Sequence, residues 1–142
     1  MLLQIVYLSK SAGAMSDEQV TDLAKACAQT NKTQDITGVL YHHNGHFIQC
    51  LEGEDSALIR LYAQILNDPR HRDILTAVIR PIEERMFPAW SMGVVPEMQA
   101  EIDFDEILPL EAARKGCWNE QTWAKILDSF RLAAVLDPYP EG

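Results

Sequence analysis

The stretch ITGVLYHHNGHFIQCLE, residues 36–52, decides the fold. Two runs of strand-forming residues flank Asn44-Gly45, a dipeptide that readily adopts the positive φ angles of a type I′ turn. The stretch therefore predicts a β-hairpin with a fixed register, in which Leu40 pairs with Gln49. The Gln49 amide would lie among apolar neighbours on one face of this hairpin. That face carries Ile36, Gly38, Leu40, His42, Phe47, Gln49 and Leu51.

The residues before the hairpin predict one strand and one helix. Residues 2–8 are apolar and rich in strand formers, which is typical of a buried strand. Ser16 and Gln19 have the spacing of a capping box, in which each side chain bonds the backbone amide of the other residue. Apolar residues then recur at helical spacing, which predicts an amphipathic helix to about residue 30.

The residues after the hairpin predict a second helix and two further strands. Asp55 or Ser56 is the expected N-cap of this helix, and Pro69 follows its end. Residues 74–82 read as a strand with poor alternation, which favours a central position that is buried on both sides. Residues 91–96 read as one more short strand.

The order of these elements, βαββαβ followed by a short strand, predicts a fold of the α+β class. It favours a ferredoxin-like sandwich, with both helices on one face of the sheet. We expect residues 1–97 to form this domain and residues 98–142 to form a helical extension.

The expected extension contains two helices. The first covers residues 104–114. The second follows Asn119 and has an apolar stripe formed by Trp123, Ile126, Leu127, Phe130 and Ala134. These helices would cover the face of the sheet opposite the first two helices.

Composition narrows the possible functions. The 142 residues are 47% hydrophobic and 23% charged, with a net charge of −9, which argues against binding to nucleic acid or to an anionic membrane surface. The three cysteines are widely spaced, which favours a reducing compartment. The apolar run at the N-terminus is too short for a signal peptide or a membrane helix. We therefore expect a cytoplasmic protein.

Motif searches leave few catalytic options. The sequence has no P-loop and no GxGxxG motif. His42, His43 and His46 cluster at the hairpin turn, but neighbouring strand residues point to opposite faces, so solvated histidines are favoured over a metal site. The scattered acidic residues show no spacing that identifies a catalytic pair.

Several other residues have both an ordinary and a functional interpretation. Tyr7 can approach Gln49, either as a satisfied core pair or as a redox-active phenol bonded to an amide that contacts a ligand. Asn31 reads as an ordinary helix C-cap. Arg70 and His71 read as turn residues, and Trp90 and Met92 as core residues. Composition does not choose between these interpretations.

Five stretches of the sequence, taken together, favour the functional interpretation of these residues. They are IVYLS (5–9), Asn31 followed by DITGVL (35–40), GHFIQCLEG (45–53), LYAQILNDPRHRD (61–73) and ERMFPAWSMGV (84–94). In this order and spacing, over about residues 1–97, the chain resembles the BLUF family of bacterial blue-light sensors that use flavin.

The resemblance implies a noncovalently bound flavin, usually FAD, between the two helices, with FMN or riboflavin as possible substitutes. It makes Tyr7 the photochemical tyrosine and Gln49 the glutamine whose hydrogen bonds switch. The remaining implied roles are flavin contacts for Asn31, Ile36, Arg70 and His71, and signalling for Trp90 and Met92.

The resemblance also implies a sensor rather than an enzyme. We expect a homo-oligomer that signals to a separate protein, because the chain leaves no room for an output enzyme. The alternative function is a flavin-binding oxidoreductase on the same fold, which would need a substrate pocket against the ring. A third is a metabolite-binding regulatory module without a chromophore.

Overall fold

The computed structural model describes residues 1–11, 15–43, 45–69, 71–88, 92–95, 123–128 and 130, without the side chains of residues 43 and 71–73. Its elements are β1 (Leu2–Ser11), α1 (Asp17–Thr33), β2 (Thr37–His43), β3 (His46–Glu54), α2 (Asp55–Leu66), β4 (His71–Pro81) and β5 (Gly93–Val94).

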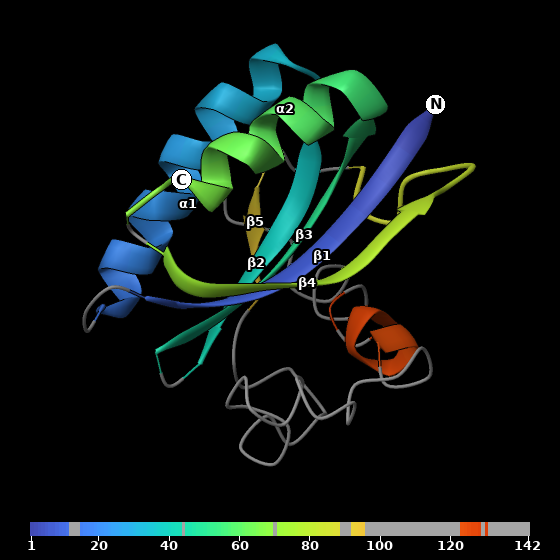
Figure 1. Cartoon of the computed structure of the whole chain (residues 1–142). Coiled ribbons are helices and arrows are strands. Elements are labelled where there is room, and N and C mark those ends of the chain that lie inside the picture. The colour runs from blue at the N-terminus through green and yellow to red at the C-terminus, as the bar shows by residue number, and fades with distance from the viewer. Residues whose placement is uncertain are drawn as a thin grey trace.

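The strands form one sheet in the order β4-β1-β3-β2-β5, with α1 and α2 side by side on one face (Figure 1). All neighbouring strands are antiparallel except β2 and β5, which are parallel. The predicted ferredoxin-like α+β fold is confirmed.

The hairpin has the predicted register. Leu40 pairs with Gln49 across β2 and β3, and Gly45 in the turn has a φ of +77°. Gly38 lies so close to the neighbouring strand that a Cβ atom there would come within 2.1 Å of the carbonyl oxygen of Cys50. The two strands therefore require a residue without a side chain at this position.

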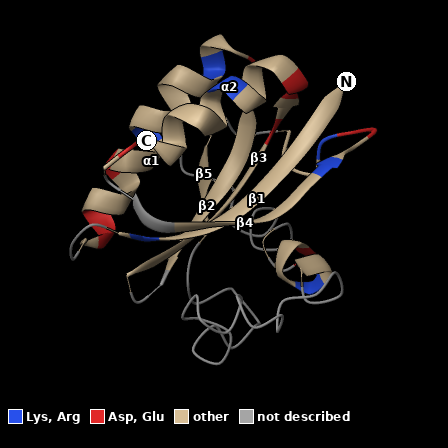
Figure 2. Ribbon diagram, viewed as in Figure 1, with Lys and Arg blue, Asp and Glu red and all other residues tan. Residues whose placement is uncertain are grey.

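The sheet separates two hydrophobic cores. Residues of β1 alternate between them: Ile5 and Tyr7 face the helices, whereas Val6 and Leu8 face the opposite side. Such alternation is the usual consequence of a two-residue strand repeat with both faces covered. Figure 2 shows Lys, Arg, Asp and Glu mainly on the helices and near strand ends, and few of them along the strands.

Helical residues 123–128 lie on the face opposite α1 and α2 (Figure 1). Trp123, Ile126, Leu127 and Phe130 are buried in the core on this face. The ring of Phe130 stacks on Tyr41 of β2 with a centroid distance of 5.4 Å. The predicted stripe is thus confirmed for these four residues. Ala134 and the helix predicted at 104–114 lie outside the described residues.

The prediction that β4 is a central strand is wrong. β4 lies at the edge of the sheet, and Ile79 is 57% exposed. The pairing of β4 with β1 shifts register between Val6 and Tyr7, so that consecutive residues Ala77 and Val78 both pack against the same core. This irregularity, rather than burial on both faces, explains the poor alternation in the sequence.

The two helix boundaries also differ from the predictions. The capping box of Ser16 and Gln19 is present, but α1 continues to Thr33. Neither Asp55 nor Ser56 caps α2: its N-cap is Glu54, whose side chain makes no capping bond.

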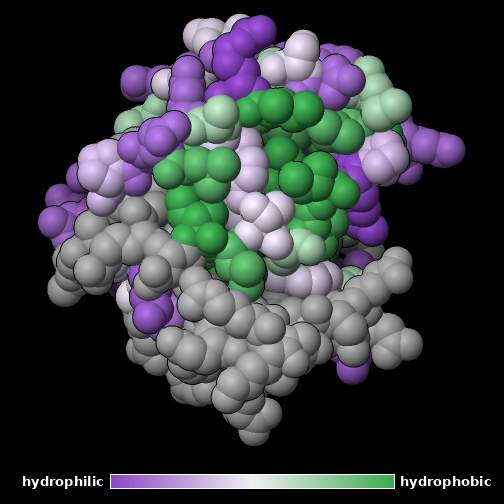
Figure 3. All heavy atoms as spheres, viewed as in Figure 1, coloured by the Kyte–Doolittle hydropathy of each residue, from purple (hydrophilic) through white to green (hydrophobic). Residues whose placement is uncertain are grey.

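Figure 3 shows apolar side chains gathered on the face between α2 and β4. Among the described residues, Ile59, Leu66 and Ile79 are all more than half exposed. No helix in the described parts of the chain is both long enough and apolar enough to cross a membrane.

Candidate functional site

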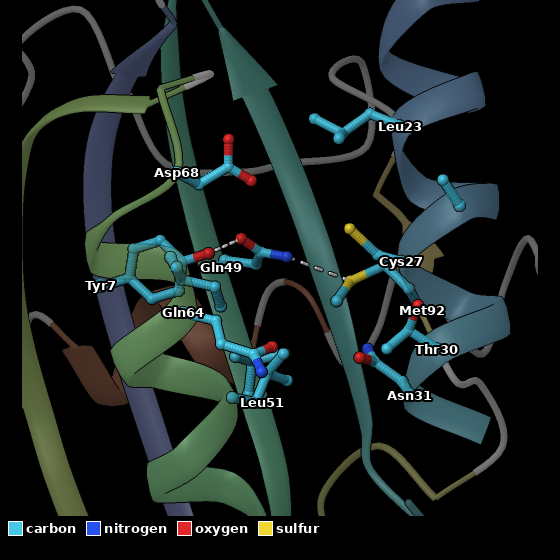
Figure 4. Close-up of a pocket in the computed structure, with 13 residues that line it drawn as sticks. Tyr7, Leu23, Cys27, Thr30, Asn31, Gln49, Leu51, Gln64, Asp68 and Met92 are labelled. Carbon is cyan, nitrogen blue, oxygen red and sulfur yellow. Dashed lines mark hydrogen bonds between the residues drawn. The ribbon is translucent and has the colours of Figure 1, made fainter. Parts of the chain in front are cut away.

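A cavity of about 230 Å³ lies between α1 and α2, above the sheet (Figure 4). Apolar side chains of both helices form much of its wall, and polar groups of the sheet and of α1 reach into it. Its lining residues are Tyr7, Leu23, Ala26, Cys27, Thr30, Asn31, Gln49, Leu51, Leu61, Gln64, Ile65, Asp68 and Met92.

Tyr7 and Gln49 meet at the floor of this cavity. They are direct partners across β1 and β3, and both face the helices. The Tyr7 hydroxyl donates a hydrogen bond to Oε1 of Gln49. Tyr7 is fully buried and Gln49 is only 4% exposed. The predicted approach of the two side chains is confirmed.

The other end of the Gln49 amide is also engaged. Its Nε2 donates to the sulfur of Met92 at 3.5 Å. Gln49 therefore links β1 through Tyr7 to the residue that precedes β5. A carboxamide has a donor end and an acceptor end, so reversing it would bring Oε1 toward the sulfur and Nε2 toward the phenol.

Asn31 lies in the last turn of α1 and is 2% exposed. It is not the helix C-cap, a position that belongs to Gln34. Its backbone carbonyl accepts hydrogen bonds from the amides of Gln34 and Ile36, which fixes the chain as it leaves the helix. Its side chain lies at the cavity (Figure 4). Ile36 is buried in the same core.

A second tyrosine lies beside Tyr7. The rings of Tyr7 and Tyr62 are 5.3 Å apart at their centroids, tilted by 47°. The Tyr62 hydroxyl shares a hydrogen bond with Thr76 of β4. Burial raises the pKa of the Tyr62 phenol, and the bond to Thr76 partly offsets this rise. Tyr62 thus remains neutral and closes the side of the site toward β4.

The sequence interpretation missed several lining residues. Leu61, Gln64 and Ile65 recur at the spacing of one face of α2, and Asp68, just after the end of the helix, belongs to the same wall. Polar Gln64 interrupts the apolar stripe, and that interruption was the available signal. Cys27 also lines the cavity from α1, and its place in the apolar helical pattern gave no sign of that.

Three of the predicted site residues are not placed. Arg70 and Trp90 lie outside the described residues, and for His71 only the strand backbone is described. Met92, in contrast, is buried at the cavity. Among the described residues, no group of three His, Cys, Asp or Glu side chains is arranged to hold a metal ion.

The cavity fits a flat heterocycle. Leu23, Leu61 and Ile65 offer apolar contacts from the two helices, and the amides of Asn31 and Gln49 offer donors and acceptors. This combination suits a ring system with apolar faces and a polar edge of carbonyl and N–H groups.

Comparison with known proteins agrees with this geometry. The family model described as "BLUF: Sensors of blue-light using FAD" matches residues 2–93. The chain belongs to the BLUF family. BLUF domains are blue-light sensors that bind flavin. Family membership therefore indicates flavin as the class of ligand and light sensing as the role of this fold.

Relatives and solved structures extend the comparison. The photoactivated adenylate cyclase subunit beta of Euglena gracilis is 37% identical over 97 residues, which is 68% of this chain and 11% of that protein. The chain therefore spans only a small part of this relative.

Two solved structures match over most of both chains. The dark-state structure of BlrB has a TM-score of 0.71 and 28% identity, covering 93% of this chain and 96% of that one. The photo-activated state of BlsA has a TM-score of 0.75 and 26% identity, with the same coverage.

Proposed function

We propose that this protein is a blue-light photoreceptor in which Tyr7 and Gln49 form the photochemical switch beside a flavin. The observation that carries the proposal is the buried hydrogen bond from the Tyr7 hydroxyl to Gln49, at the floor of a cavity between two helices. A solvated pair would exchange partners with water, whereas this pair is held in one arrangement by both strands.

A bound flavin supplies absorption of blue light and, when excited, a one-electron oxidant. Tyr7 would supply the electron that this oxidant takes up, and its hydroxyl would pass its proton to Oε1 of Gln49 along the hydrogen bond that joins them. Once both had returned to Tyr7, Gln49 would be left rotated or as its tautomer, with its donor end in a different place. The change involves one or two hydrogen bonds, about 1–3 kcal/mol, and no net reaction.

Further contacts follow from the walls of the cavity. We propose that Asn31, at the cavity, and Ile36, in the same core, contact the ring from the α1 side. The contacts proposed for Arg70 and His71 on its far side rest on the family resemblance alone. The described lining contains no Lys or Arg but includes the carboxylate of Asp68. Such a lining favours recognition of the ring over the phosphates, so we propose FAD as the native ligand with FMN and riboflavin as substitutes.

The signal leaves through a protein contact. Met92 receives the hydrogen bond of Gln49 and adjoins β5, which pairs with β2. We propose that Met92, with Trp90, transmits the change to a separate protein partner and that the receptor is a homo-oligomer without enzymatic activity of its own. The relative named as an adenylate cyclase subunit is matched over only 11% of its length, so its cyclase activity is not assigned to the present chain.

The test is a visible spectrum before and after blue light, on the purified protein loaded with FAD. Wild type is expected to show a reversible red shift. Tyr7→Phe is expected to bind FAD but to lose the shift, because the ring still packs while the hydroxyl is gone. Tyr41→Phe is the matched control, since Tyr41 is equally buried but lies in the opposite core. A normal shift in Tyr7→Phe would overturn the assignment of the donor.

The oxidoreductase alternative has its own readout. If the protein were such an enzyme, steady oxidation of a reduced nicotinamide in the dark would accompany flavin binding. Absence of turnover together with a reversible red shift supports the sensor.

A further inference from the structure

Glu52 is a fully buried carboxylate. It lies on β3, the strand that also carries Gln49 at the floor of the cavity. It lies three residues after Gln49, so the two side chains leave the strand on opposite faces. Gln49 faces the helices, whereas Glu52 lies on the same side as Val6 and Cys50. The switch residue and this carboxylate therefore belong to one rigid strand but to two different faces.

The Glu52 carboxylate holds the segment that connects β4 with β5. Its Oε2 accepts from the backbone amide of Met86 at 3.1 Å, and its Oε1 accepts from the amide of Phe87 at 2.9 Å. Because β4 and β5 lie at opposite edges of the sheet, this segment must cross the whole sheet. Glu52 fixes it partway across.

A second chain of hydrogen bonds fixes the carboxylate itself. Arg80 of β4 donates from Nε to Oε1 of Gln4 at 2.7 Å, and Gln4 donates from Nε2 to Oε2 of Glu52 at 2.9 Å. The arginine thereby determines which end of the Gln4 amide faces Glu52. A buried carboxylate with three donors, as here, is stable only while those donors stay in place.

The neighbouring Arg85 makes further hydrogen bonds that hold the same segment. Its guanidinium donates to the backbone carbonyl of Glu52 and to the carbonyl of Asp35, which follows α1. It also donates to the hydroxyl of Thr37 at 2.9 Å. Residues 85–87 are thus bound to β3 and to the end of α1, while Met92, a few residues later, contacts Gln49 on the other face.

We infer that Glu52 is a positioning residue for the light switch: by fixing the backbone at Met86 and Phe87, it determines where Met92 lies against Gln49. The inference rests on the proposed function and adds to it a structural support on the opposite face of the sheet. Phe87 also belongs to the core that contains Phe130, so the same carboxylate holds the segment against the C-terminal helical residues.

Glu52→Gln tests the inference on the full chain loaded with FAD. The new amide nitrogen faces a donor in either orientation: the amide of Phe87 in one, or Nε2 of Gln4 and the amide of Met86 in the other. The segment therefore loses at least one of its two bonds to residue 52, and hydrogen exchange at Phe87, Met86 or both is expected to accelerate by about tenfold or more. The methyl signal of Met92 is expected to move in the dark state, and the dark recovery of the spectrum to change by roughly threefold or more.

A charge-swapped double variant supplies the rescue. In Gln4→Glu/Glu52→Gln, the amide at position 52 donates to the carboxylate at position 4, which also receives Nε of Arg80. Protection at Phe87 and the Met92 signal are expected to return, whereas Met86 stays without its acceptor. Thr37→Val is the control, because it removes a partner of Arg85 at the same end of the sheet and leaves the Glu52 carboxylate untouched.

Two results would overturn the inference. One is unchanged exchange at Met86 and Phe87 in Glu52→Gln. The other is faster exchange with an unmoved Met92 signal and an unchanged recovery rate, which would make Glu52 merely structural. If Glu52→Gln does not fold, the double variant carries the same comparison. Absence of a light-induced shift in wild type would refute the proposed function. The role of Glu52 would still be tested in the dark, by hydrogen exchange and by the position of the Met92 signal.

Discussion

Asn31 shows how burial changes the meaning of a residue. An Asn near the end of a helix is commonly a cap, and the sequence alone favoured that interpretation. In the structure the helix continues past it, and its side chain lies at the cavity with little solvent contact. A carboxamide offers both donor and acceptor groups, and at the wall of a cavity these suit the polar edge of a bound ligand.

Asn31→Ala is expected to weaken flavin binding by about tenfold, because the ring edge would lose a hydrogen-bond partner. Titration of the apoprotein with FAD, followed by quenching of flavin fluorescence, measures the effect. Thr33→Ala is the control, since Thr33 is exposed on the same helix. Equal affinities of Asn31→Ala and wild type would show that Asn31 serves the helix alone.

Among the elements, the β2–β3 hairpin is the one most tightly constrained. Gly38 allows the close approach of β2 to the carbonyl of Cys50, and this carbonyl belongs to the strand that also carries Gln49. Burial raises the pKa of the Cys50 thiol well above its usual value, so Cys50 packs in the opposite core as a neutral side chain.

Gly38→Ala is expected to lower the free energy of unfolding by about 3 kcal/mol or more, because the new methyl group meets backbone that has no room to move. Urea unfolding followed by circular dichroism measures it. Gly53→Ala provides the comparison: its Cβ would meet a side-chain carbon of Ile36 at 3.0 Å, which can yield. Equal losses in the two variants would contradict this account.

The elements also show what sequence patterns can and cannot predict. The hairpin register followed from Asn44-Gly45 and the alternation of apolar residues, because both are local. The edge position of β4 was not predictable from the sequence. The register shifts between β4 and β1 produce the same order of apolar residues as a strand that is buried on both faces. The Tyr7–Gln49 contact was predictable from strand pairing, but the Glu52 network was not, since two of its donors are the backbone amides of Met86 and Phe87, far along the chain.

At the scale of the whole molecule, the sheet is a shared wall between the flavin side and the side covered by residues 123–128. Tyr41 and Phe130 stack on the second side, and Val95 lies in the same core, just after β5. A change at Gln49 therefore has a short route through Met92 to the C-terminal helical residues. A static cover that only shields the sheet is the alternative.

Hydrogen exchange in the dark and under blue light distinguishes a signalling route from a static cover. We expect light-dependent changes in protection within residues 92–95 and 123–128, because Met92 contacts the switch and Val95 lies in the same core as Ile126 and Leu127. Peptide-level mass spectrometry on the FAD-loaded chain is sufficient, with Tyr7→Phe as the unresponsive control. Changes confined to residues 1–53 would assign residues 123–128 to a cover and place the partner on the flavin side.

The strand order has a consequence for how the protein is made. β1 pairs with β3 on one side and with β4 on the other, although β4 is synthesised long after β1. Once β3 has emerged from the ribosome, the outer edge of β1 stays open for roughly one to five seconds, until the residues up to Pro81 have emerged as well. An open, apolar strand edge is a template for pairing with other chains. Slow translation between residues 55 and 81 is therefore the step at which nascent copies are most exposed to aggregation.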